Sequence, residues 1–223
     1  MTHLEVELQK VRQFAIEMMH MVKSQLHKGR EAFFSANKDM AFDVLHTERR
    51  VNGYELLIDS ECESLIARLN PVAIDLRFVL ATLKINYHLE RIADNTKSIA
   101  QNVVDMTPVW DQELLQKLRL AEAFDTVESM LDDVIDSFEK ENTAMARKVF
   151  EKDKIVDQIN KDCIHIISEY LKSNGTHMEQ DINLLLIHRK LERIGDLIKN
   201  ISEEIIFYIE AKILKHVSKA DMT

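Results

Sequence analysis

Carboxylate side chains recur in this sequence four residues apart, a spacing that places two of them on one face of a helix. The pairs are Glu90 with Asp94, Asp153 with Asp157, and Glu192 with Asp196. Like charges at this spacing destabilise an isolated helix by about 0.2–0.5 kcal/mol, and a multivalent cation would offset that repulsion. Because the candidate ligands are oxygen donors, without His or Cys at matching positions, the pattern favours Mg²⁺, Mn²⁺ or iron over a structural zinc site.

These pairs belong to a longer internal repeat. Residues 89–94 read Leu-Glu-Arg-Ile-Ala-Asp, and residues 191–196, 102 positions later, read Leu-Glu-Arg-Ile-Gly-Asp. Upstream of each copy, residues 46–52 match residues 151–157. Two segments that recur in the same order and at nearly the same separation indicate that one unit was duplicated.

Acidic pairs also arise without a function. With 38 acidic residues in 223 positions, about six such pairs are expected by chance, and helix surfaces are ordinarily charged. On a helical wheel, one apolar stripe contains Ile187, Leu191, Ile194, Ile198, Ile201 and Ile205. Glu192 and Asp196 lie roughly 140–180° from its centre, so we expect them to face solvent or a partner. A solvated face explains any single pair, whereas recurrence in register in both halves favours a surface metal site.

The elements that carry these residues are predicted to be helices, because a 223-residue sheet protein would need more turn formers than four Gly and two Pro. Apolar residues spaced three and four apart predict six long helices, which span about 2–34, 38–69, 71–105, 108–141, 143–172 and 177–217. Asn70-Pro71, Thr107-Pro108 and the capping box Thr176/Glu179 would begin the third, fourth and sixth helices. We therefore expect an all-α fold of two tandem, pseudo-symmetric three-helix bundles, with domains at 1–106 and 107–223.

Composition excludes several classes of function. The net charge of −9 disfavours nucleic acid, and the apolar stretches are too short for direct membrane insertion. The first residues carry acids and a helical period where a signal peptide would be basic and then apolar. Cys62 and Cys163 are interpreted as small core residues of a reduced, cytoplasmic protein.

The sequence patterns of known enzyme sites are also incomplete in this chain. A di-iron bundle would need Glu-x-x-His twice with inward-pointing ligands, and the chain has this pattern once, at Glu17–His20. A phosphotransfer histidine is a further alternative, but His88 and His188 precede the repeated motif by different distances. A nucleophile elbow and a glycine-rich phosphate loop are both lacking. The sequence therefore predicts regulatory binding and no enzyme activity.

Several segments together resemble the PhoU family, the accessory and regulatory proteins of bacterial phosphate-specific transport. The similarity rests on residues 70–77, which read Asn-Pro-Val-Ala-Ile-Asp-Leu-Arg, on both copies of the six-residue motif, on residues 153–157, and on Asn200-Ile201. The resemblance implies two three-helix bundles in a cytoplasmic protein, often a homodimer, that negatively regulates phosphate uptake and the phosphate-starvation response. Its implied partners are the ATPase subunit of the phosphate ABC transporter and a phosphate-sensing histidine kinase.

The same resemblance implies surface clusters of divalent or iron-type metal ions in some members. Carried over position by position, the ligands would be Glu48, Glu90 and Asp94 in the first half, and Asp153, Asp157, Glu192 and Asp196 in the second. Asn52 stands where the first half would have a second carboxylate, so we expect the second site to bind metal more strongly. An alternative that the residues leave open is a metal-binding or metal-buffering helical scaffold with no link to phosphate.

Overall fold

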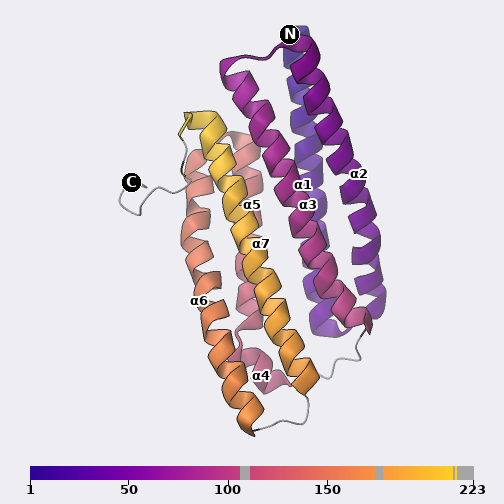
Figure 1. Ribbon diagram of the computed structural model, residues 1–223, viewed down its shortest axis with the longest axis vertical. Coiled ribbons are helices and arrows are strands. Elements are labelled where there is room, and N and C mark those ends of the chain that lie inside the picture. The colour runs from indigo at the N-terminus through magenta and orange to yellow at the C-terminus, as the bar shows by residue number, and fades with distance from the viewer. Residues whose placement is uncertain (106–110, 174–177, 213, 215–223) are drawn as a thin grey trace.

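The computed structural model describes residues 1–105, 111–173, 178–212 and 214. Over these residues it forms seven α-helices: α1 (His3–Ser35), α2 (Lys38–Leu69), α3 (Ala73–Asp105), α4 (Gln112–Lys117), α5 (Leu120–Lys140), α6 (Thr143–Ser173) and α7 (Met178–Glu210). Six are long and lie side by side, and the short α4 sits at one end (Figure 1). The all-α prediction is confirmed.

The first two helices begin at residues whose side chains accept hydrogen bonds from free backbone amides, and each ends at a residue in the left-handed conformation. Thr2 Oγ1 accepts a hydrogen bond from the Glu5 amide at 3.2 Å, and Glu5 Oε2 accepts one from the Thr2 amide at 2.8 Å, which makes a reciprocal capping box. Ala36 adopts a left-handed conformation with φ 51° after α1. Asn37 then caps α2 by accepting a hydrogen bond from the Met40 amide at 3.1 Å.

The prediction that Asn70 caps the third helix is wrong. Asn70 has φ 45° and ψ 58°, and it ends α2. Asn tolerates this left-handed conformation better than most residues do, so it serves as a C-cap here. Pro71 is buried between the two helices, and α3 begins only at Ala73. The second Pro signature, Thr107-Pro108, lies outside the described residues.

The predicted fourth helix is in fact two. Arg119, between α4 and α5, has φ 52°, which breaks the helix, and its guanidinium pairs with Glu122, the third residue of α5. The change of direction lets Leu114, Leu118 and Leu120 all reach the core. The last helix is also shorter than predicted, because Ala211 has φ 58° and α7 ends at Glu210. Thr176 of the predicted capping box lies outside the described residues.

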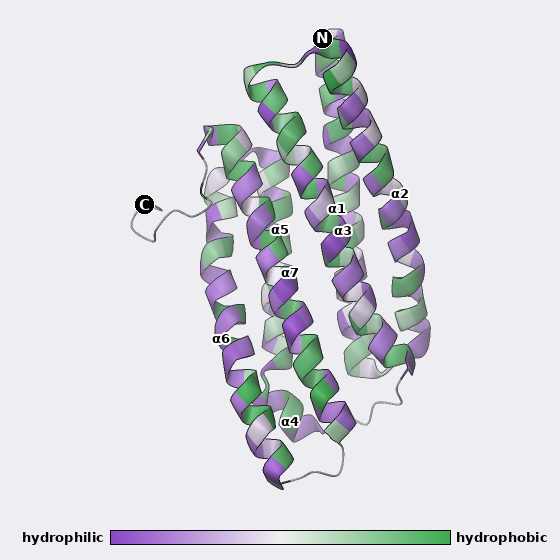
Figure 2. Cartoon of the chain, viewed as in Figure 1, coloured by the Kyte–Doolittle hydropathy of each residue, from purple (hydrophilic) through white to green (hydrophobic). Residues whose placement is uncertain are grey.

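The long helices form two groups of three. Helices α1, α2 and α3 pack on one another, as do α5, α6 and α7, and the groups meet where α3 packs on α7 and α1 on α5. This arrangement confirms two three-helix bundles. One continuous cluster of buried apolar residues runs through both halves, and each long helix carries hydrophobic and hydrophilic positions along its length (Figure 2). The proposed domain boundary at residues 106 and 107 falls outside the described residues, so it stays a prediction.

Aromatic residues pack across the contact between the halves. The ring of Phe138 on α5 lies 6.2 Å from that of Phe78 on α3 and 6.1 Å from that of Tyr208 on α7. At the other end of α5, the ring of Phe124 lies 5.9 Å from that of Phe33 on α1. Ring pairs at such separations add to the stabilisation from buried area. Each end of α5 is therefore anchored to the first half.

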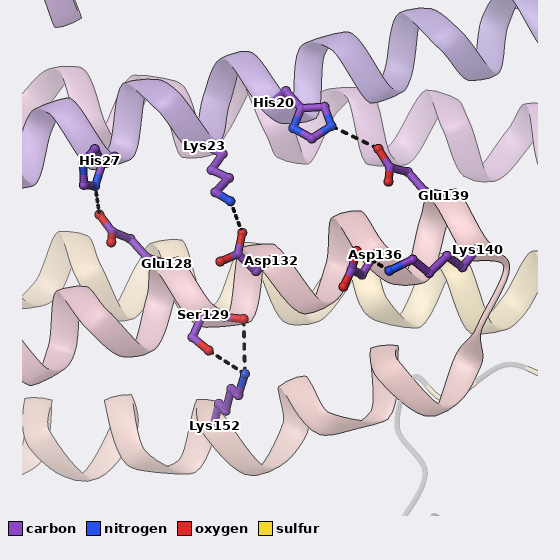
Figure 3. A network of polar contacts seen from close by, with 10 residues as sticks. All are labelled: His20, Lys23, His27, Glu128, Ser129, Asp132, Asp136, Glu139, Lys140 and Lys152. Carbon is purple, nitrogen blue, oxygen red and sulfur yellow. Dashed lines mark hydrogen bonds and ion pairs between the residues drawn. The ribbon is translucent and has the colours of Figure 1, made fainter.

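A row of ion pairs runs along the rim of the contact between α1 and α5. The pairs are Arg12–Glu141, His20–Glu139, Lys23–Asp132, His27–Glu128 and Arg30–Asp125. In each pair α1 supplies the basic member, and α5 or its C-cap Glu141 supplies the acid. The two histidine pairs are ionic only when the histidine is protonated. Figure 3 shows the pairs of His20, Lys23 and His27. We call this set the α1–α5 ion-pair row.

Two helical glycines are expected to respond oppositely to alanine. A Cβ at Gly29 would lie 3.0 Å from Thr96 Cγ2, and Thr96 is fully buried. A Cβ at Gly195 would meet Asp153 Oδ1 at an ordinary 3.6 Å. Because alanine in a helix is favoured over glycine by about 1 kcal/mol, Gly195→Ala should raise the free energy of unfolding in urea titrations, whereas Gly29→Ala should lower it. Gly53→Ala, with nothing within 4 Å, is the control, and an equal gain at positions 29 and 53 would contradict the prediction.

Candidate functional site

The predicted ligands fall into two groups, one in each half. We call Glu48, Glu90 and Asp94, from α2 and α3, the first carboxylate set, and Asp153, Asp157, Glu192 and Asp196, from α6 and α7, the second carboxylate set. In both sets the members lie on two helices that pack against each other. Facing helices therefore bring together acids that are far apart in the sequence.

Asp153 is the most buried member of the second carboxylate set, with 6% of its surface exposed. Lys199 Nζ donates one hydrogen bond to Asp153 Oδ2 at 2.7 Å and another to Asp196 Oδ1 at 2.8 Å. Burial raises the pKa of Asp153, and the Lys199 ammonium opposes that rise. Burial alone would lower the pKa of Lys199, but its bonds to the two carboxylates raise that pKa overall. The ammonium thus joins α7 to α6 through a buried carboxylate.

The first carboxylate set has the same arrangement. Glu48 is 8% exposed, and its Oε1 accepts hydrogen bonds from Lys97 Nζ and from Asn52 Nδ2, both at 3.0 Å. Asn52 therefore turns its amide nitrogen towards the carboxylate, while its buried Oδ1 has no hydrogen-bond partner among the described residues. Lys97 corresponds to Lys199 in the repeat, since both follow the motif aspartate by three residues. The same lysine-to-carboxylate bridge has formed twice.

Glu90 and Glu192 occupy equivalent places in the two sets and share an electrostatic environment. Burial raises the pKa of Glu90, with further increases from Glu55 and Asp94. Burial likewise raises the pKa of Glu192, helped by the charges of Asp196 and Asp157. Mutual repulsion of this kind shows that the acids of each set lie close enough to affect one another.

Sequence reasoning missed three residues at these sites, namely Lys97, Lys199 and Glu55. A signal existed for each one. The two lysines stand 102 positions apart, the same offset as the repeated motif, and Glu55 follows Glu48 by seven residues, two turns along the same face of α2.

The outward orientation was expected for Glu192 and Asp196 on the last helix and does not extend to Glu48 and Asp153, which are both buried. On α7, the side chain of Asp196 is 32% exposed, in the direction that the wheel predicts. The wheel described α7 alone, whereas Glu48 and Asp153 lie on α2 and α6, on the sides that α3 and α7 cover. Whether each carboxylate is buried therefore depends on whether a neighbouring helix packs over it.

Oxygen donors of this kind suit hard cations, but their arrangement does not fit a metal cluster. Within the described part of the chain, no three His, Cys, Asp or Glu side chains converge on a point that could hold a metal ion. The most buried carboxylate of each set is bonded to a lysine instead. The metal-ligand roles of the seven acidic residues stay a prediction.

Of the two cysteines and the two histidines that precede the repeated motif, three side chains are enclosed in the core, and the fourth, that of His88, is half-buried. Cys62 and Cys163 are free and fully buried, and burial raises the pKa of each thiol to about 12. His188 is 1% exposed, and burial lowers its pKa to about 4. The interpretation of both cysteines as core residues is confirmed, and His188 is not placed to receive a phosphoryl group from a partner. Among the helices described, none has the length and apolar character to cross a bilayer.

Comparisons with known proteins agree along nearly the whole chain. A family model described as the PhoU domain matches residues 15–103 and again residues 120–205. The phosphate-specific transport system accessory protein PhoU of Edwardsiella tarda is 31% identical over 216 residues, covering 97% of this chain and 88% of that protein. Its counterpart in Escherichia coli strain K12 is 31% identical over 211 residues, with 95% and 87% covered.

Solved structures show the same similarity in three dimensions. The crystal structure of PhoU from Pseudomonas aeruginosa matches with a TM-score of 0.89 at 26% identity, covering 94% of this chain and 100% of that one. The phosphate transport system regulatory protein PhoU from Streptococcus pneumoniae matches with a TM-score of 0.82 at 24% identity, covering 96% and 100%. The second of these supports the fold alone. Each half of the present fold thus corresponds to one copy of the matched domain.

Proposed function

Because this chain belongs to the PhoU family, we propose that it is a negative regulator of phosphate uptake and of the phosphate-starvation response. It acts by binding the ATPase subunit of the phosphate ABC transporter and a phosphate-sensing histidine kinase, in the cytoplasm and as a homodimer. The observation that supports this is the match of both halves to the PhoU domain. The relatives named above are accessory proteins of phosphate-specific transport.

The molecule is better suited to binding than to catalysis. Its two thiols are buried, with the pKa of each raised to about 12, so neither offers a thiolate near neutral pH. Helices of about 30 residues run roughly 45 Å, and packed side by side they present long, rigid faces to a partner. The net charge of −9 makes a nucleic acid an unsuitable partner. Contact with other proteins remains the function that these features favour.

Direct capture tests the transporter partner. We expect the immobilised, purified protein to retain the ATPase subunit of the phosphate ABC transporter from the same organism. The ATPase subunit of an unrelated ABC importer is the matched control, since it shares the nucleotide-binding fold but not the phosphate pathway. Retention of both subunits to the same extent, or of neither, would count against the proposal.

A gene deletion tests the regulatory part of the proposal. In cells grown with abundant phosphate, alkaline phosphatase should rise when the gene is removed and fall again when the intact gene is restored. Unchanged repression in the deletion strain would remove the regulatory role, even if the ATPase subunit is captured in vitro.

A further inference from the structure

We propose that Lys97 and Lys199 are the resident cations of the two carboxylate sets, so that each set is neutralised from within the chain and holds its two helices together without a metal ion. This inference does not depend on the proposed regulatory function. It follows from the contacts of the two lysines and from the failure of the acids to converge on a metal position.

The same bridge is present in both halves of the repeat. Each lysine follows the aspartate of its motif by three residues. Each crosses to the neighbouring helix and meets a buried carboxylate, Glu48 in one half and Asp153 in the other. A contact formed by chance on a charged surface would not be expected to recur between corresponding helices of both halves.

The surroundings make these contacts strong. The side chains of Glu48 and Asp153 are only 10% and 9% exposed, whereas those of Lys97 and Lys199 are 38% and 27% exposed. The N–O distances of 2.7 and 2.8 Å at Lys199 are those of charge-assisted hydrogen bonds, and the distance at Lys97 is 3.0 Å. A buried carboxylate without a partner is strongly unfavourable. Each lysine ammonium therefore neutralises a buried carboxylate that a metal ion would otherwise have to neutralise.

The two sets differ in how firmly they hold their lysine. Lys199 bonds two carboxylates, Asp153 and Asp196. Among the residues that the structure describes, Lys97 bonds only Glu48, and Oε1 of Glu48 also accepts the hydrogen bond from the Asn52 amide. The extra carboxylate of the second set would make it the stronger metal site. Its oxygens are also the ones that accept more hydrogen bonds from the lysine ammonium. A divalent cation could use those oxygens only after the lysine left them.

The test compares Lys97→Met and Lys199→Met with the parent protein. Methionine keeps an unbranched side chain of similar length and removes the charge. Lys140→Met is the matched control, because Lys140 pairs with Asp136 on an exposed helix surface. Thermal unfolding of the purified, full-length proteins is measured in EDTA and again in MnCl₂ or MgCl₂. Metal content after dialysis is measured by elemental analysis.

We expect the midpoint of thermal unfolding of the parent protein to be the same in EDTA and in MnCl₂ or MgCl₂. In EDTA, Lys199→Met should lower the midpoint by at least about 5 °C, with a smaller loss for Lys97→Met and almost none for Lys140→Met. Metal should return part of the loss in the two lysine variants. A parent protein that is itself stabilised by metal, or lysine variants that match the control in EDTA, would overturn the proposal.

A double variant keeps the test decisive if Lys199→Met folds poorly. Asp153→Asn combined with Lys199→Met removes the buried charge together with its partner, and it should unfold at a higher temperature than Lys199→Met alone. A double variant that unfolds at or below the midpoint of the single variant would show that the two residues are not coupled, and this would also overturn the proposal.

Discussion

Replacing Phe138 by alanine is expected to lower the free energy of unfolding by about 3–5 kcal/mol, the range for deleting a buried aromatic side chain. Phe138 is fully buried, and its ring packs against Phe78 of α3 and Tyr208 of α7. Deleting it opens a cavity where the two halves meet, and helices that are held elsewhere by their own contacts cannot close it completely. Urea titration followed by circular dichroism measures the loss.

Phe42→Ala provides the control for that experiment. Phe42 lies on α2 and is 46% exposed, so the same truncation there should change the free energy of unfolding by no more than about 0.5 kcal/mol. Because one apolar core runs through both halves, the chain should also unfold in a single transition. Equal losses at the two positions would show that Phe138 does not join the halves as described.

Acid is expected to destabilise the protein through His188 across the range from pH 6.5 down to about pH 4. Burial lowers the pKa of this histidine from its ordinary value of 6.5 to about 4. Between these values the unfolded chain binds a proton that the folded chain does not, so stability falls as the pH falls. Above pH 6.5 neither state is protonated at this position, and below about pH 4 the loss stops growing. One pKa unit corresponds to about 1.4 kcal/mol, so the full loss approaches about 3 kcal/mol.

His188→Leu isolates this contribution. The free energy of unfolding of the variant and of the parent, measured in urea at a series of pH values, should draw apart in favour of the variant as the pH falls from 7 to 4. His46→Leu, at an exposed position on α2, should follow the parent curve. Parallel curves for the parent and His188→Leu would show that the acid sensitivity lies elsewhere.

Much of the fold could be predicted because its helices are long and amphipathic. The expected bounds of the first, second and fifth helices agree with α1, α2 and α6 to within about two residues. The break at Arg119 could not be foreseen, since no Gly or Pro marks it. It arises because Leu114, Leu118 and Leu120 reach the core together only if the chain turns there, and that depends on tertiary packing.

The acidic residues of the candidate site could be predicted from the sequence, but the burial of these residues and their lysine partners could not. Spacing along the sequence identified the acidic pairs and their duplication. Burial of Glu48 and Asp153 depends on the helix that faces each of them, which a wheel for one helix does not represent. The roles of Lys97 and Lys199 depend on side chains that cross between helices. The 102-residue separation of the two lysines was visible in the sequence, but only the packing of the helices shows which carboxylate each lysine contacts.

The contact between the halves has two parts that respond differently to dissolved salt: the α1–α5 ion-pair row at the rim and the buried aromatic rings at the centre. Most of its members are partly exposed, and at physiological ionic strength counter-ions screen charges over about 8 Å. The buried rings of Phe33, Phe78, Phe124 and Phe138 have no such dependence. Added salt should therefore weaken the ion pairs at the rim, whereas the contacts between the aromatic rings keep the halves joined.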